Sequence, residues 1–73
     1  MHIAITGATG FLGRYLVRRL AAAGHRLRCW YRPTSDRSGF ENIAGAIDWL
    51  EGNLRDPGNI AALVKGADAA VHA

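Results

Sequence analysis

Four short apolar runs along the chain predict β-strands. They span His2–Thr6, Leu27–Tyr31, Ile47–Glu51 and Asp68–Ala73. The first run is β-branched, has no alternating polar positions and ends in a glycine, so we expect it to be buried on both faces of a sheet. Pro33 closes the second run, because a proline cannot continue a central strand.

Longer stretches with helical periodicity separate these runs. From about Gly10 the apolar spacing becomes that of a helix, which Gly24 ends as a residue tolerant of positive φ. A second helix is predicted to begin with Asp56 as N-cap and Pro57 as first helical residue, and to end at Gly66. The apolar stripe of the first helix is predicted to comprise Leu12, Tyr15, Leu16, Leu20 and Ala23, with Arg19 at its edge, where the stem covers apolar surface and the head reaches water. That of the second comprises Ile60, Leu63 and Val64.

The order of these elements predicts the fold class. A loop over 33–39 and a short helix over 40–46 complete the chain. Strands then alternate with helices throughout, which is typical of an α/β protein with a parallel sheet and right-handed crossovers. We therefore predict about four parallel strands with flanking helices.

Three glycines, Gly7, Gly10 and Gly13, lie between the first strand and the first helix. In that context the first permits a tight turn, the second lets the backbone approach a pyrophosphate, and the third lets helix and strand pack closely. The N–H groups near Phe11 and Leu12 would point at the phosphates, whose charge the helix dipole favours. A ligand-free glycine turn is the simpler alternative, and the surrounding strand and helix weigh against it. A P-loop NTPase is excluded, because no Gly-Lys-Ser or Gly-Lys-Thr follows.

Composition narrows the class of protein. The 73 residues, 49% apolar and 21% charged, fit one small globular domain. No apolar run approaches the roughly 20 residues needed to cross a bilayer. No signal peptide is recognisable, so we expect a cytoplasmic protein without a membrane partner. Cys29 is predicted to be a buried structural thiol, and the three histidines lack metal-ligand spacing.

The net charge of +3 arises from basic residues concentrated between Arg14 and Arg37. Such a concentration favours nucleic acid or a phosphorylated ligand as partner. No helix-turn-helix, zinc-finger or RNA-stacking pattern accompanies it, so nucleic acid is the weaker alternative.

The segment Thr6-Gly7-Ala8-Thr9-Gly10-Phe11-Leu12-Gly13 resembles the TGxxGxxG signature of the extended short-chain dehydrogenase/reductases. That family includes sugar-nucleotide epimerases and dehydratases and NADP-dependent reductases. The Gly24-His25 turn, the stretch 49–56 and the ending 67–73 are similar to the family in order and spacing. The resemblance covers essentially the whole chain and implies a partial Rossmann fold with strand order 3-2-1-4.

The resemblance also implies which residues hold a dinucleotide. Asn53 stands where the family usually has an aspartate beside the adenine, so the charge is lost although a carbonyl acceptor remains. The last strand would run beneath the cofactor, with His72 serving in packing. The residues implicated are Thr6, Gly7, Thr9, Gly10, Phe11, Leu12, Gly13, Asn53, Leu54 and Ala73.

The end of the second strand discriminates NAD from NADP. An acidic residue there, about 20 residues beyond the glycines, would bind the ribose hydroxyls and repel a 2′-phosphate. Tyr31 is not acidic, and Arg32 can pair with a 2′-phosphate through charge-assisted hydrogen bonds. Arg37 lies in the same loop, and Arg14 is a further candidate. The sequence therefore predicts NADP over NAD, with a solvated Arg32 as the alternative.

The catalytic residues of the resembled family are missing. Its chemistry relies on a Tyr-x-x-x-Lys pair, and neither Tyr15 nor Tyr31 has a lysine four residues on. We expect an inactive N-terminal portion of a larger oxidoreductase or epimerase, since the roughly 250 to 350 residues of such a protein exceed this length. A non-catalytic NADP-sensing module is the alternative. The strand containing Ala69, Ala70 and Val71 would form an apolar edge able to pair with a second copy.

Overall fold

The computed structural model describes residues 1–52 and 57–73. Within them one sheet has the strand order β3-β2-β1-β4, and every neighbouring pair is parallel. The predicted parallel sheet with order 3-2-1-4 is confirmed. The strands are β1 (His2–Thr6), β2 (Arg26–Tyr31), β3 (Ile47–Glu51) and β4 (Ala69–His72).

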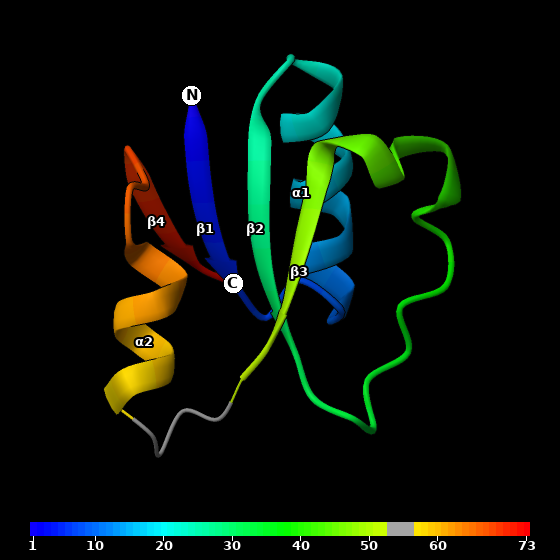
Figure 1. Ribbon diagram of the computed structural model, residues 1–73. Coiled ribbons are helices and arrows are strands. Elements are labelled where there is room, and N and C mark those ends of the chain that lie inside the picture. The colour runs from blue at the N-terminus through cyan, green and yellow to red at the C-terminus, as the bar shows by residue number, and fades with distance from the viewer. Residues whose placement is uncertain (53–56) are drawn as a thin grey trace.

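The helices cover opposite faces of this sheet. Figure 1 shows α1 behind the sheet and α2 in front of it. Pro57 opens α2 as predicted, whereas its proposed N-cap, Asp56, lies outside the described residues. Gly24 follows α1 with a φ of +91°, as expected of the residue that ends it. The helical segments are α1 (Phe11–Ala22), the 3-10 helix η1 (Glu41–Ala46) and α2 (Pro57–Val64).

The central strands hold the core. Ile3 and Ile5 of β1 face α1, where they pack with Val17 and with β2. Ala4 faces the other way and packs with Trp30 and α2. Ile3, Ala4 and Ile5 are all buried, as predicted for a strand covered on both faces. A fully buried side chain of valine or isoleucine size contributes about 1.5–3 kcal/mol to the stability of the fold. Because β1 is held in place by this burial, its end, where the glycine loop begins, is fixed as well.

The predicted core-facing stripe of α1 is wrong in the first turn. Leu12 and Tyr15 are 63% and 60% exposed, and the buried positions are Gly13 and Val17. A Cβ on Gly13 would lie 1.9 Å from the carbonyl oxygen of Gly7. The helix therefore approaches the sheet along the Gly13 side, which turns the first-turn apolar side chains outward. Ala23, another member of the predicted stripe, is also exposed.

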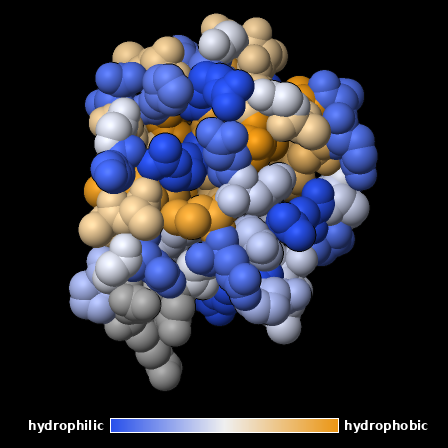
Figure 2. Space-filling model, viewed as in Figure 1, coloured by the Kyte–Doolittle hydropathy of each residue, from blue (hydrophilic) through white to orange (hydrophobic). Residues whose placement is uncertain are grey.

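The face that carries α2 is less completely covered. Of the apolar stripe predicted for α2, Leu63 is buried, while Ile60 and Val64 are 45% and 42% exposed. Arg26 and Arg28 of β2 stand on this face and so explain the polar positions in a central strand. Figure 2 shows hydrophobic side chains on this face only in patches among hydrophilic ones.

Candidate functional site

A cavity of about 460 Å³ lies where the strands end at their carboxyl edge. In parallel sheets ligands bind at this edge, at the point where the chain crosses from one side of the first strand to the other. Here that point lies between β1 and β4. The cavity is lined by Thr6, Gly7, Thr9, Trp30, Tyr31, Arg32, Thr34, Ser35, Gly52, His72 and Ala73.

Two glycines of the loop are required by the protein itself. Gly7 has a φ of +78°, and a Cβ there would lie 2.3 Å from the carbonyl oxygen of Ala73. The amide of Ala73 donates to the Thr6 carbonyl at 3.0 Å, which ties the end of β4 to the loop. Gly13 is the contact point between α1 and the loop. The turn and the close packing predicted for these two glycines are confirmed.

The second glycine differs from its neighbours. Gly10 has a φ of −76°, which any residue adopts, and a Cβ there would meet only the Gly7 carbonyl oxygen, at 3.4 Å. It forms the N-cap of α1, whose first backbone bond runs from the Arg14 amide to the Gly10 carbonyl. The amides of Phe11 and Leu12 precede that bond and have no intrahelical acceptor. Nothing within the described residues requires a glycine at position 10.

The loop over 33–39 forms a second wall of the cavity. It begins with a turn in which the Ser35 amide donates to the Arg32 carbonyl at 2.8 Å and the Arg32 amide donates to Ser35 Oγ at 2.9 Å. Thr34 and Ser35 consequently line the cavity beside Arg32. Further along, hydrogen bonds from the Ser38 side chain and from the Ser38 amide to the Asp36 carboxylate lower the pKa of Asp36.

The three arginines predicted near the ribose have different surroundings. Arg32 lines the cavity, and its guanidinium has no hydrogen-bond or ion-pair partner among the described residues. Arg37 lies over the Tyr31 ring, 3.9 Å from its centroid, and 5.6 Å from that of Trp49. Arg14 is bonded to backbone carbonyls. Arg32 alone of these three both lines the cavity and is free to bind a ligand.

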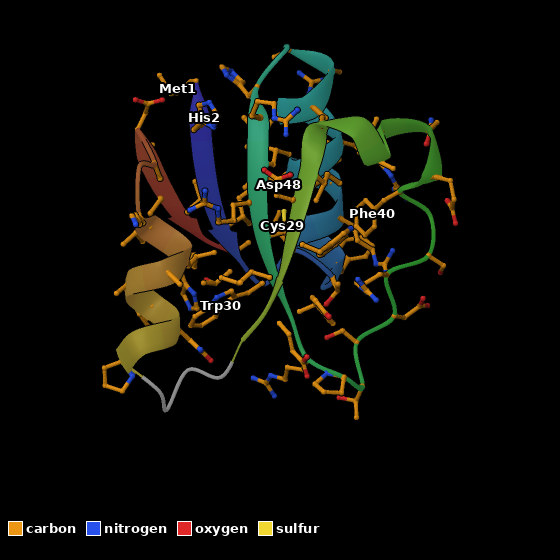
Figure 3. The ribbon with its side chains drawn as sticks, in the orientation of Figure 1. Met1, His2, Cys29, Trp30, Phe40 and Asp48 are labelled. Carbon is orange, nitrogen blue, oxygen red and sulfur yellow. The ribbon has the colours of Figure 1, made fainter. Side chains whose placement is uncertain are left out.

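Trp30 forms part of the cavity wall on the α2 side. Figure 3 shows its side chain between α2 and the lower ends of the central strands. Its indole Nε1 is buried without a hydrogen-bond partner among the described residues. A Cβ on Gly52 would lie 2.7 Å from the indole ring, so the tryptophan requires a glycine there. The pair closes the cavity beneath the end of β3.

Two further lining residues have side chains that meet across β1 and β4. Thr6 Oγ1 lies 2.5 Å from His72 Nδ1. The two residues are paired in the β1–β4 register, so the sheet itself brings them together. His72 was expected to serve in packing, and it instead stands exposed at the rim of the cavity.

The sequence-predicted site residues are only partly brought together. Gly10, Phe11, Leu12 and Gly13 stand at the start of α1 beside the cavity without lining it, and Arg37 packs on Tyr31. Asn53 and Leu54 lie outside the described residues. Those that line the cavity are Thr6, Gly7, Thr9, Tyr31, Arg32 and Ala73.

Five lining residues were missed from the sequence. Thr34 and Ser35 carried a usable signal, because two hydroxyl residues follow a proline directly after Arg32. Gly52 carried another, since it closes a strand at the same edge of the sheet. Trp30 and His72 lie within predicted strands, and no sequence signal indicated that they line a cavity.

Metal and membrane features are absent from the described part of the chain. No group of three histidine, cysteine, aspartate or glutamate side chains within it is arranged to hold a metal ion. None of its helices has the length and apolarity needed to span a bilayer.

The parallel order β3-β2-β1-β4, with a glycine loop leading into α1 at the crossover, defines a Rossmann-type α/β fold. Residues 3–73 match the sequence model of the NAD dependent epimerase/dehydratase family. The chain belongs to this family, within the extended short-chain dehydrogenase/reductases, whose members bind a dinucleotide cofactor.

Known proteins similar to this chain are much longer. Ceramide reductase of Caulobacter vibrioides is 40% identical over 70 residues, which are 96% of this chain and 22% of that protein. Sterol demethylase protein B of Methylococcus capsulatus is 36% identical over 72 residues, which are 99% of this chain and 21% of that protein. The crystal structure of vestitone reductase from alfalfa superposes with a TM-score of 0.84 at 27% identity, covering 97% of this chain and 24% of the other. The chain thus spans about a fifth of the length of the curated relatives it matches.

Proposed function

We propose that this chain is the cofactor-binding portion of an NAD(P)-dependent oxidoreductase or nucleotide-sugar epimerase/dehydratase, and that it prefers NADP. The cavity at the carboxyl edge of the sheet would hold the adenosine half, and the start of α1 the pyrophosphate. Membership of the family supports a dinucleotide as the ligand. The residues around Arg32 support a preference for the dinucleotide that carries a 2′-phosphate.

The observation that carries the proposal is the unexplained glycine at position 10. Gly7 and Gly13 are glycines because backbone atoms of the protein occupy the space of a Cβ. At Gly10 a Cβ would meet one atom of the described residues, the Gly7 carbonyl oxygen at 3.4 Å, and its φ suits any residue. The N-cap position of α1 favours a glycine only modestly, whereas close approach of a pyrophosphate at the start of a helix requires one.

The chemistry of the helix start fits this ligand. The amides of Phe11 and Leu12 are donors without intrahelical acceptors, and α1 has no acidic residue in its first turn. The helix dipole places partial positive charge at the same end. A doubly charged pyrophosphate would satisfy both features at once.

The preference for NADP rests on Arg32. It lines the cavity with a guanidinium that has no partner among the described residues, beside the hydroxyl residues Thr34 and Ser35. A guanidinium binds a phosphate dianion through paired, charge-assisted hydrogen bonds. Tyr31, which precedes it, offers no carboxylate to bind ribose hydroxyls or repel the phosphate. Together these groups favour the phosphorylated ribose.

Calorimetric titration of the purified chain with NADP and with NAD tests the proposal. Arg32→Ala is expected to weaken NADP binding by about tenfold or more, the effect of losing one charge-assisted contact, and to leave NAD binding nearly unchanged. Arg19→Ala removes the same charge from an exposed position on α1 and is the matched control. Equal affinity for NAD and NADP in both the unaltered chain and Arg32→Ala would show that Arg32 is a solvated loop residue.

Turnover by these 73 residues is not expected. The Tyr-x-x-x-Lys pair on which the family's chemistry depends is missing from the sequence. We assign catalysis to the part of a longer protein that corresponds to the remaining four fifths of its relatives. Oxidation of NADPH by the purified chain, followed spectroscopically with candidate carbonyl substrates, would refute this assignment.

A further inference from the structure

One side chain connects the two walls of the cavity. Arg14 Nε donates to the Thr9 carbonyl at 2.9 Å, within the glycine loop. Its Nη1 donates to the Ser38 carbonyl at 2.5 Å, and its Nη2 donates to the Asp36 carbonyl. Thr9 lines the cavity, and so do Thr34 and Ser35, which directly precede the part of the 33–39 loop that Arg14 contacts. Arg14 thus bridges two segments that are distant in sequence and adjacent to the same ligand space.

The Arg14 guanidinium lies against a buried aromatic ring. The Arg14 guanidinium lies 5.0 Å from the centroid of Phe40, which is 3% exposed. Arg18, one turn further along α1, lies 5.9 Å from the same centroid and donates to the Gly39 carbonyl at 3.3 Å. Figure 3 shows Phe40 beside the loop that leads into β3. The end of the 33–39 loop is therefore built around these two cations.

Gly39 is adapted to this arrangement. It has a φ of +88°, and a Cβ there would lie 3.0 Å from Arg18 Nη2 and 3.5 Å from Arg14 Nη1. A Cβ here would press on the Arg18 guanidinium and meet the Arg14 guanidinium at ordinary contact distance, and the positive φ disfavours any residue with a side chain. The loop conformation next to the two arginines therefore depends on a glycine at position 39.

These contacts argue against Arg14 as a phosphate ligand. All three of its nitrogens donate to carbonyls, and Arg14 does not line the cavity. We infer that Arg14 is a positioning residue, which holds the glycine loop and the 33–39 loop at the separation that a dinucleotide spans between its pyrophosphate and its adenosine ribose. This inference rests on the proposed dinucleotide site.

The guanidinium shape is essential to this role. A planar fork can reach three carbonyls on two loops at once, whereas a lysine ammonium is a compact point charge on a flexible stem. Arg14→Lys should therefore behave like Arg14→Met, although it retains the charge. A phosphate-binding arginine would be partly replaced by lysine, so the two roles are separable.

The test measures affinity for NAD and for NADP by calorimetry, together with amide hydrogen exchange of residues 33–39 in the ligand-free chain. Arg14→Lys and Arg14→Met are each expected to weaken both dinucleotides by about tenfold, one RT ln 10 step in affinity, and to speed exchange in the loop. Arg19→Met, on the same helix and exposed, should change neither quantity. Gly39→Ala perturbs the same bridge from the loop side and should weaken both dinucleotides even if an Arg14 variant does not fold.

Wild-type affinity in Arg14→Lys, or a loss confined to NADP, would overturn the inference. The first result would show that the fork is dispensable, and the second that Arg14 binds the 2′-phosphate. Failure of the unaltered chain to bind either dinucleotide would refute the proposed function itself. The exchange rates would then still report whether Arg14 fixes the loop.

Discussion

Positions 7, 10 and 13 show how one residue type serves two purposes within a single loop. At Gly7 and Gly13 backbone atoms occupy the space of a Cβ, at 2.3 Å and 1.9 Å. At Gly10 the nearest atom is 3.4 Å away. The fold therefore requires two of the glycines, and we assign the third to the ligand.

This distinction predicts opposite effects of two alanine substitutions. Gly13→Ala should lower the free energy of unfolding by about 1–3 kcal/mol, as expected for overpacking. Gly10→Ala should lower it by no more than about 1 kcal/mol, because alanine is a poorer N-cap than glycine but no side-chain cap hydrogen bond is lost. Dinucleotide affinity should nevertheless fall at least about tenfold in Gly10→Ala, because its methyl group would meet the pyrophosphate. Urea unfolding and calorimetry check the two quantities, and full affinity in Gly10→Ala would contradict the assignment.

Cys29 illustrates a residue whose chemistry is suppressed by burial. Its side chain is fully buried between β1 and α1, and burial, with a smaller contribution from Asp48, raises the pKa of the thiol to about 12. At about pH 8 only about one thiol in ten thousand would be ionised, and the thiolate is the reactive form. The native chain should therefore resist a thiol-specific reagent and react fully once denatured in urea. Rapid labelling of the native chain would show that this part of the core opens readily.

Among the elements, α2 depends on a contact from the sheet. Arg28 of β2 donates through Nη1 to the carbonyls of Ala62, Leu63 and Lys65, at 3.0, 3.3 and 2.7 Å. These carbonyls belong to the C-terminal end of the helix, where intrahelical donors run out and the dipole is negative. One arginine therefore satisfies the end of α2 and attaches it to β2.

Loss of this contact should destabilise the protein measurably. Arg28→Met is expected to lower the free energy of unfolding by about 1.5–3 kcal/mol, the range for hydrogen bonds that involve a charged group. Arg26→Met is the matched control two residues away on the same face. Arg26 pairs with Asp48 at 3.3 Å and donates to the Gly45 carbonyl at 3.1 Å, but its side chain is more than half exposed, and exposed pairs contribute about 1 kcal/mol or less. Equal shifts in the urea midpoint for the two variants would mean that Arg28 does not cap α2.

The sequence predicted where helices and strands lie along the chain better than it predicted which faces of them are buried. The bounds of β1 and β3 agree with the apolar runs, because a short buried strand is defined by its apolar residues alone. The face of α1 was wrong at Leu12 and Tyr15, since its orientation is set by the approach of Gly13 to Gly7, a tertiary contact. A small residue can thus define the buried side of a helix that apolar periodicity misplaces.

For the whole molecule, the site is assembled by topology. The glycine loop could be recognised because its residues are contiguous. Trp30 and His72 reach the same cavity only because β2 and β4 flank β1 and end at the same edge. Arg14 donates to loop carbonyls and not to a ligand because of the path that the 33–39 loop takes. The local sequence does not define that path.

Within residues 1–52 and 57–73, β4 is an edge strand that pairs with β1 alone. Ala69 and Ala70 are exposed there, and Val71 is half-buried. Unpaired strand edges promote pairing with another chain, so we expect concentration-dependent self-association of the 73-residue chain in sedimentation equilibrium. Ala70→Lys should weaken it, because a charge on an edge strand opposes pairing. Ala61→Lys, at an exposed position on α2, should leave it unchanged. A monomer at all concentrations would show that the edge does not pair.

The most direct test of the account maps a bound dinucleotide onto the chain. Backbone amide resonances of the isotope-labelled protein are followed by NMR during titration with NADP. The largest shifts are expected at Gly10, Phe11 and Leu12 and at Arg32, Thr34 and Ser35, with little change along the outer face of η1. An unchanged spectrum, or shifts confined to a surface away from the carboxyl edge of the sheet, would contradict it.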